Sequence, residues 1–150
     1  MQTRGYTGAV PLKRTLPPDL DARLEGLGEA VAAASPDIQF AYLFGSAATG
    51  ALTPQSDIDV AIYVSSRADA HAIRLAVARA AARQLATDAV DVVLLNTAPL
   101  SLSGRVLGSR RVIVERDPHA RHAYESATLR KFHDFRIREH RILAERGAHG

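Results

Sequence analysis

The feature that most restricts how this chain can fold is the segment over residues 57–64, which begins with two aspartates and continues with alternating apolar residues. Successive side chains of a strand point to opposite faces, so Asp57 and Asp59 would share one face, about 7 Å apart along the strand. The other face would be continuously apolar, with Ile58, Val60, Ile62 and Val64. Because two carboxylates at this spacing repel each other unless a cation lies between them, the segment predicts a buried strand with a metal site.

A short apolar segment over residues 38–44 ends at Gly45 and Ser46, and ten residues later Asp57 begins the segment just described. Glycine lets a backbone approach a phosphate closely, and the N–H groups of a helical turn after it would point at the anion. Ser46 adds a hydroxyl donor. Neither a Gly-Ser pair nor an Asp-x-Asp pair is specific alone, but together they predict a phosphate-binding turn beside a metal site.

A third aspartate, Asp91, lies in the apolar segment over residues 89–95. An alanine-rich helix predicted over residues 68–86 would connect the two segments as a crossover, which would set Asp91 beside Asp57 and Asp59. Three carboxylates at one rim can hold two magnesium ions. The alternative for Asp91 is an edge-strand aspartate that faces water and needs no cation.

The whole pattern predicts one α/β (α+β) domain over residues 1–150, with a small mixed β-sheet flanked by helices and a long C-terminal helix. Asp117 would cap this last helix, with Pro118 in its first turn. Residues 1–16 are predicted to form a flexible arm or an edge strand. The predicted helices cover residues 17–35, 68–86, 99–108 and 117–146, and the predicted strands cover residues 38–44, 57–64, 89–95 and 111–115.

Composition excludes several classes of protein. The chain has no cysteine, which excludes disulfides, thiolate metal sites and cysteine nucleophiles. No apolar run approaches the roughly 18 residues of a membrane span, and no signal peptide is recognisable, so we expect a soluble, cytoplasmic protein. The net charge of +3 is compatible with an anionic ligand or an acidic partner, but its scatter favours a general arginine-rich composition. We expect no direct binding of nucleic acid.

Several other residues are weaker site candidates. Arg105, Arg110 and Arg111 are possible phosphate contacts. His119 and His122 have a metal-chelating spacing, but without a further ligand nearby we interpret them as solvated.

Two patterns on the C-terminal helix each allow two interpretations. Arg116, His122 and Tyr124 match the short Arg-x5-His-x-Tyr pattern of HEPN ribonucleases, which are all-helical, so four strand segments favour a coincidence. An apolar stripe follows one face of the same helix, and it could pack against the sheet or dock a partner. The stripe consists of Tyr124, Thr128, Phe132, Phe135 and Ile142.

The motif Gly45-Ser46, ten residues and Asp57-x-Asp59, with Asp91 downstream, resembles the DNA polymerase β-like nucleotidyltransferase superfamily. The size and order of the elements resemble its minimal members, the MntA-type antitoxins of HepT/MntA toxin–antitoxin pairs, over about residues 38–140.

This resemblance implies that Gly45 and Ser46 bind the phosphates of ATP and that Asp57 and Asp59 coordinate two Mg2+ ions. Asp91 would bind the catalytic metal and help to deprotonate the acceptor hydroxyl. The implied activity is transfer of AMP to a tyrosine of a cognate HepT-like HEPN toxin, with which the chain would form a hetero-oligomer. The alternatives are a small-molecule (aminoglycoside-like) nucleotidyltransferase and a catalytically inert antitoxin that only binds its toxin.

The chain departs from this pattern at one position. Many relatives have Gly-Ser-x-Ala-Arg-Gly, whereas here Thr49 stands in place of the arginine. This change removes a fixed positive charge near the nucleotide, so we expect an effect on rate and nucleotide affinity rather than loss of activity.

Overall fold

The computed structural model of the chain describes residues 15–149, so the predicted arm over residues 1–16 lies almost entirely outside the described residues. None of the helices within residues 15–149 is both long and apolar enough to cross a membrane. The helices are α2 (Leu20–Glu25), α3 (Leu27–Ala34), α4 (Ser46–Thr49), α5 (Ala70–Leu85), α6 (Leu100–Ser109) and α7 (Pro118–His149), and the strands are β1 (Ile38–Phe44), β2 (Ile58–Val64), β3 (Val90–Leu94) and β4 (Arg111–Glu115).

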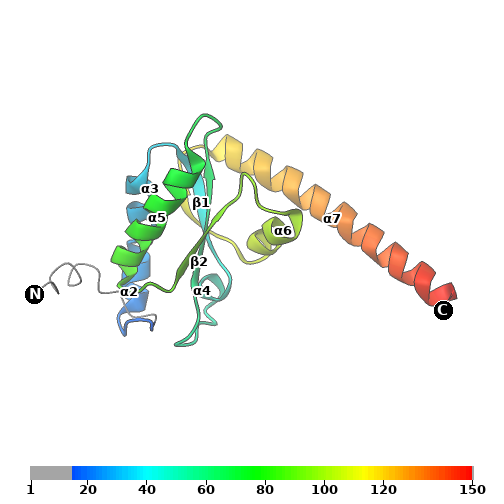
Figure 1. The fold of residues 1–150 in the computed structure, drawn as a ribbon, viewed down its shortest axis with the longest axis horizontal. Coiled ribbons are helices and arrows are strands. Elements are labelled where there is room, and N and C mark those ends of the chain that lie inside the picture. The colour runs from blue at the N-terminus through cyan, green and yellow to red at the C-terminus, as the bar shows by residue number, and fades with distance from the viewer. Residues whose placement is uncertain (1–14, 150) are drawn as a thin grey trace, which may run out of the picture.

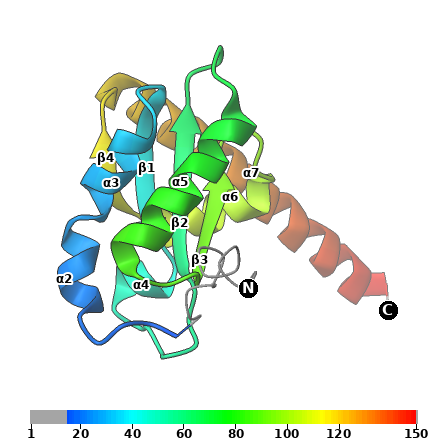
Figure 2. The same ribbon diagram turned by 60° about the vertical axis from the view of Figure 1, so that its left-hand side comes forward.

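The four strands form one mixed sheet in the order β3-β2-β1-β4. β1 is antiparallel to both β2 and β4, whereas β2 and β3 are parallel and are joined through α5. Helices α2, α3 and α5 cover one face of the sheet, and α6 and α7 lie on the other (Figure 1, Figure 2). The predicted fold class, a mixed sheet flanked by helices with a long C-terminal helix, is confirmed.

β2 is buried on both faces, which explains its apolar sequence. Ile58, Val60 and Ile62 are fully buried in the larger core, together with residues of α3 and α5. The opposite face carries Tyr63, whose ring stacks on Phe40 of β1 at a centroid distance of 4.8 Å, in a second core that includes residues of α6. The predicted alternation along β2 is therefore confirmed.

The single helix predicted over residues 17–35 is two helices, separated at Gly26. A Cβ atom at Gly26 would lie 2.5 Å from Nε2 of Gln84, so a larger residue here would displace the end of that side chain of α5. Gln84 in turn donates a hydrogen bond of 2.9 Å to the carbonyl oxygen of Arg23. Leu20 and Leu27 are both buried across the break, which is why the apolar spacing did not reveal it.

A buried carboxylate fixes the first half of α7 to the sheet. Glu125 accepts hydrogen bonds of 2.6 Å from the Tyr42 hydroxyl of β1 and 2.9 Å from Arg121, and it lies 3.0 Å from Nε of Arg110. Burial by itself raises the pKa of Glu125, but the hydrogen bonds from Tyr42 and Arg121 and the two arginine charges outweigh it, and the pKa is lowered. The same burial and hydrogen bond raise the pKa of Tyr42. The network joins β1, α7 and the turn that follows α6.

Helices α6 and α7 also pack directly against each other, and this contact depends on Gly104. A Cβ atom at this position would overlap the ring of Phe132, which lies directly against the α6 backbone. A Cβ atom at Gly108, one turn further along α6, would meet no atom within 4 Å, so this position faces open space.

We expect Gly104→Ala to lower the melting temperature measured by circular dichroism, because the added methyl group displaces Phe132 at a cost of about 1–3 kcal/mol. Gly108→Ala is the matched control, and its higher helix propensity should leave stability equal or raise it by up to about 1 kcal/mol. Equal melting temperatures for the two variants would contradict this packing of Phe132 on α6.

Candidate active site

Asp59 of β2 and Asp91 of β3 are paired residues of two neighbouring parallel strands. Paired residues of a parallel ladder point to the same face. Since Ile58 and Val60 point into the core beside α5, Asp59 and Asp91 project on the side of the sheet where α6 lies. The structure thus brings two of the three predicted carboxylates together, although β3 is an edge strand and Asp91 is exposed.

Asp57 lies immediately before β2, which begins at Ile58 rather than at Asp57 as predicted. Its charge nevertheless acts on Asp59. Burial raises the pKa of Asp59, the charges of Asp91 and Asp57 raise it further, and the charge of Arg105 opposes them. The three aspartates therefore form one electrostatic cluster whose negative charge is only partly compensated.

Gly45, at the end of β1, passes directly beside this cluster. Its backbone, at φ 68° and ψ −150°, has a conformation that is essentially restricted to glycine. A Cβ atom here would lie 2.6 Å from Oδ2 of Asp59. The N–H group of Gly45 donates a 2.9 Å hydrogen bond to Oγ of Ser109, at the end of α6. Ser109 was not predicted as a site residue, because its partner lies 64 residues away and no local pattern marks it.

Ser46 begins the single-turn helix α4, as predicted, and is half-buried beside Gly45. Thr49, at the end of this turn, is exposed, and its hydroxyl donates a 3.4 Å hydrogen bond to the carbonyl oxygen of Gly45. α4 carries no basic residue.

The three arginines considered as phosphate contacts lie in different places. Arg105 is the one whose charge acts on Asp59. It precedes Ser109 by one turn of α6, so both share the helix face that looks towards Gly45. Arg110 instead binds Glu125, and Arg111 lines a cavity beside Thr49 that also contains acidic residues of α2.

The carboxylates suit a hard divalent cation. Within residues 15–149, no group of three or more His, Asp or Glu side chains is gathered closely enough to hold a metal ion alone. Mg2+ is rarely held in an all-protein cage, and it usually takes one or two carboxylates with waters and substrate phosphates. A nucleotide beside Gly45 would supply such phosphates, so this donor set fits Mg2+ bound together with its substrate.

The remaining sequence candidates lie outside this site. His119 and His122 are exposed, and Nε2 of His122 lies 3.0 Å from a guanidinium nitrogen of Arg121. Arg116 donates hydrogen bonds of 2.6 Å and 2.7 Å to the carbonyl oxygens of Ser35 and Ala32. It therefore holds the end of α3, which supports coincidence as the explanation of the HEPN-like spacing.

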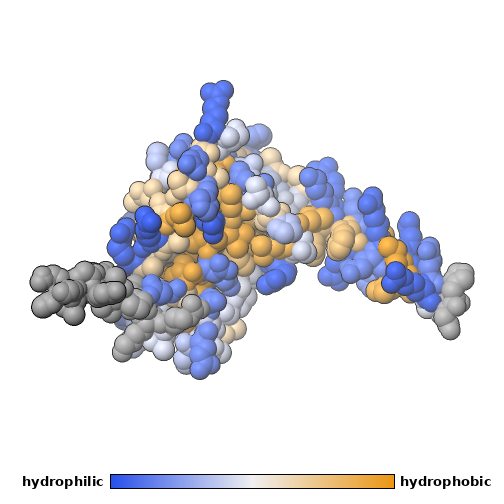
Figure 3. Space-filling view, viewed as in Figure 1, coloured by the Kyte–Doolittle hydropathy of each residue, from blue (hydrophilic) through white to orange (hydrophobic). Residues whose placement is uncertain are grey.

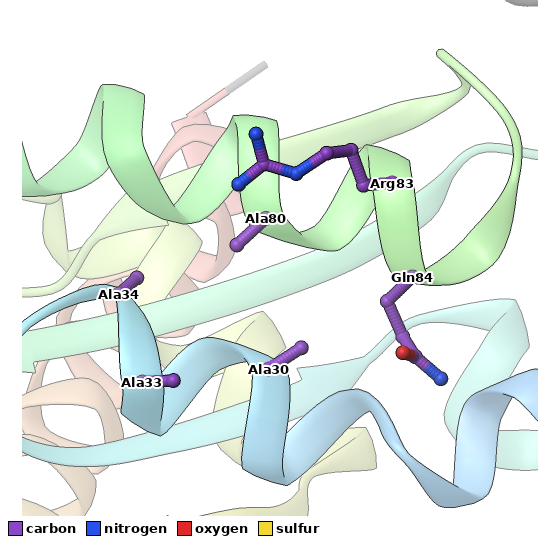
Figure 4. A pocket seen from close by; sticks show the side chains of 6 residues that line it. All are labelled: Ala30, Ala33, Ala34, Ala80, Arg83 and Gln84. Atoms are coloured by element: carbon purple, nitrogen blue, oxygen red, sulfur yellow. The ribbon is translucent and has the colours of Figure 1, made fainter.

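One surface pocket of about 370 Å³ lies between α3 and α5, over the face of the sheet opposite Asp59 (Figure 4). Its lining is mostly alanine, with one arginine and one glutamine side chain and no carboxylate. The lining residues are Ala30, Ala33, Ala34, Ala80, Arg83 and Gln84. It therefore lacks the carboxylate cluster found around Asp59.

We expect Asp59→Asn to raise the melting temperature at pH 7 by about 2–4 °C, which corresponds to a modest relief of repulsion for a partly solvated group. A carboxyl group whose folded pKa is raised loses stability as pH rises through that pKa, so the difference from wild type should shrink towards zero as pH falls to about 4. Asp88→Asn, at an exposed aspartate outside the cluster, should change nothing. A destabilised Asp59→Asn variant would contradict this electrostatic account.

Residues 29–119 match the protein family described as Polymerase beta, Nucleotidyltransferase. No protein of curated function is significantly similar in sequence to this chain. A chain of a solved structure described as a toxin–antitoxin with AMP-PNP is 24% identical at a TM-score of 0.65, over 82% of this chain and 96% of that one.

Two further solved structures have the same fold. One is the tri-AMPylated Shewanella oneidensis HEPN toxin in complex with MNT antitoxin, with 21% identity and a TM-score of 0.62 over 84% of this chain and 97% of that chain. The other is a toxin–antitoxin MntA-HepT structure, with 22% identity and a TM-score of 0.61 over 83% of this chain and 97% of that chain. Because the family match spans more than half of the sequence and contains all three aspartates with Gly45 and Ser46, the chain belongs to the polymerase β nucleotidyltransferase family.

Proposed function

We propose that this nucleotidyltransferase transfers AMP from ATP to a tyrosine hydroxyl of a HEPN-type toxin and so neutralises it. The observation that carries the proposal is the in-register pair Asp59 and Asp91, with the charge of Asp57 beside it and the backbone of Gly45 against Asp59. Solved structures with this fold include complexes with an AMP-PNP ligand and with an AMPylated HEPN toxin, which supports both the donor and the acceptor.

In this proposal Asp57 and Asp59 would hold two Mg2+ ions, and Asp91 would help to hold the catalytic one. The ions would neutralise the charge that develops on the phosphates during transfer. Two exposed carboxylates and one half-buried carboxylate give oxygen ligands that can reach a nucleotide from the solvent side. Burial is the main reason that the pKa of Asp59 is raised, and the charges of Asp91 and Asp57 raise it further. A bound cation would compensate the negative charge of these three side chains.

Gly45 and Ser46 would hold the phosphates of ATP. The absence of a side chain at Gly45 lets its half-buried backbone pass close to Asp59, and the hydrogen bond from its N–H group to Ser109 fixes the turn. Asp91 would accept the proton of the acceptor hydroxyl. The hydroxyl oxygen then bonds to the α-phosphorus, the bond from this phosphorus to the bridging oxygen breaks, and pyrophosphate leaves.

An acceptor on another protein fits the exposure of the site. Asp57 and Asp91 are both exposed, so the acceptor reaches them from outside the sheet. A partner protein would itself form the missing wall and exclude water around the hydroxyl.

The test is to incubate the chain with Mg2+, ATP and the product of the adjacent gene, and to weigh that partner by mass spectrometry. We expect a gain of one or more AMP units. Asp57→Asn should slow the transfer by about 100-fold or more, because it removes a ligand of the phosphate-bound cations. Asp88→Asn, an exposed aspartate three residues before Asp91, is the matched control and should transfer normally.

Two outcomes would favour the alternatives. A partner that is neutralised but gains no mass would indicate an antitoxin that acts by binding alone. Labelling of an aminoglycoside with no labelling of the partner would indicate a small-molecule nucleotidyltransferase.

Arg105 would supply the phosphate-binding charge that Thr49 does not. It shares a face of α6 with Ser109, which contacts Gly45, and it is the cation that acts on Asp59. An arginine that enters the site from α6 can therefore replace one from α4, since a phosphate contact depends on where the guanidinium lies.

We expect Arg105→Ala to weaken AMP-PNP binding about tenfold by calorimetry, the usual scale for one charged contact. Thr49→Arg introduced into Arg105→Ala should restore most of that affinity. Arg111→Ala, beside Thr49 but on the side of α2, is the control and should bind normally. If loss of Arg111 weakens binding and loss of Arg105 does not, the assignment is wrong.

A further inference from the structure

The second half of α7, residues 129–147, projects away from the rest of the domain (Figure 1, Figure 2). Every residue from 133 to 147 is exposed. The apolar stripe predicted on this helix is consequently divided, because Thr128 is buried and Phe132 packs on α6, whereas Phe135 and Ile142 are 46% and 51% exposed. Packing explains the first half of the stripe. In the second half, Phe135 lines a pocket together with Leu100 of α6, whereas Ile142 is exposed.

One face of the projecting half carries a groove of about 600 Å³, which we call the α7 groove. Its residues follow each other at the three- and four-residue spacing of a single helix face. They are Leu129, Phe132, His133, Arg136, Ile137 and His140. The groove thus combines an apolar floor with a rim of basic side chains, and orange apolar atoms are visible among blue polar ones along this helix (Figure 3).

The projecting half also holds the excess charge of the chain. Residues 129–147 contain six arginines and lysines but three acidic residues, whereas basic and acidic residues are equal in number over residues 1–128. The whole net charge of +3 therefore lies on this helix, and the apparent scatter of charge along the sequence conceals this concentration. A positive surface of this kind attracts an acidic one and speeds its association.

We propose that the α7 groove docks the partner protein through an apolar surface bordered by carboxylates. The identity of that partner as the AMP acceptor rests on the proposed function. Like charges would face each other if two copies of α7 paired through this groove, which disfavours a second copy. Leu129 and Ile137 on the groove floor can neither pair with phosphate charges nor donate hydrogen bonds to them, which disfavours nucleic acid as the occupant.

This arrangement separates docking from chemistry. The partner would bind to a helix that presents anchors at i, i+3, i+4 and i+7, a common mode of protein recognition. Phe132 joins the groove to the packed part of the domain, because the same ring lies against Gly104 of α6. A partner on the groove is therefore held beside α6, the helix that also carries Arg105 and Ser109 at the active site.

The test is to measure the dissociation constant of the full chain and the adjacent-gene product by calorimetry without ATP. Ile137→Glu and Arg136→Glu should each weaken binding at least about tenfold, the scale of residues at the centre of an interface. The matched controls are Ile142→Glu and Arg138→Glu, which make the same changes on other faces of the same helix and should bind within about twofold of wild type. Binding by the wild type should also weaken as salt increases.

The readouts separate this inference from the proposed function. A complex that depends on Ile137 and Arg136 but carries no AMP after reaction would support the docking surface and overturn the transfer activity. Equal binding by the groove variants and their controls, or no complex with the wild-type chain, would overturn the docking surface even if AMP is transferred. The remaining outcome is that the wild-type chain instead self-associates or binds a short DNA or RNA duplex. If Ile137→Glu abolished either of these, the groove would have a different occupant and the proposed docking surface would be overturned.

Discussion

The charge of Asp59 is the constraint around which this domain is organised. It is half-buried at the start of a strand whose other residues are packed on both faces, so burial raises its pKa, and two further carboxylates raise it more. A flexible segment would relieve such repulsion by moving apart. β2 cannot do so, because it is paired with β1 on one side and with β3 on the other. The cost of holding the carboxylates together is therefore met by the two cores and by the strand pairing.

Two carboxylates of this chain show how different environments shift the pKa of the same group in opposite directions. Glu125 is buried among hydrogen-bond donors and has a lowered pKa. It therefore stabilises the fold at pH values above the pKa that a glutamate has in the unfolded chain, and this stabilisation is lost as pH falls through the lowered pKa. Asp59 has a raised pKa, so its charge opposes folding as pH rises. Glu125, whose charge is compensated by two arginines, joins α7 to the sheet. The charge of Asp59 is only partly compensated by Arg105, so a cation could bind there.

Much of this arrangement could be predicted from the sequence because it depends on local patterns. The alternation in residues 58–64 identifies the central strand, and the length of the α5 crossover places β3 parallel beside it. Gly45 could be identified as a site residue because its position requires a backbone conformation that is essentially restricted to glycine, so the motif contains a glycine there. What could not be predicted depends on contacts between distant segments. The break at Gly26 reflects the approach of Gln84, and the bond from Gly45 to Ser109 spans 64 residues.

The threonine at position 49, where many relatives have an arginine, also has to be judged from contacts between distant segments rather than from the local motif. A motif records which residue precedes or follows another, whereas a phosphate experiences only the positions of the charges around it. In this fold α6 returns to the side of the sheet on which Asp59 projects, so Arg105, 56 positions after Thr49, is close enough for its charge to act on Asp59. The same helix carries Gly104 towards α7 on another of its faces. Because α6 contacts both regions, its position fixes the geometry of the turn at Gly45 relative to the α7 groove.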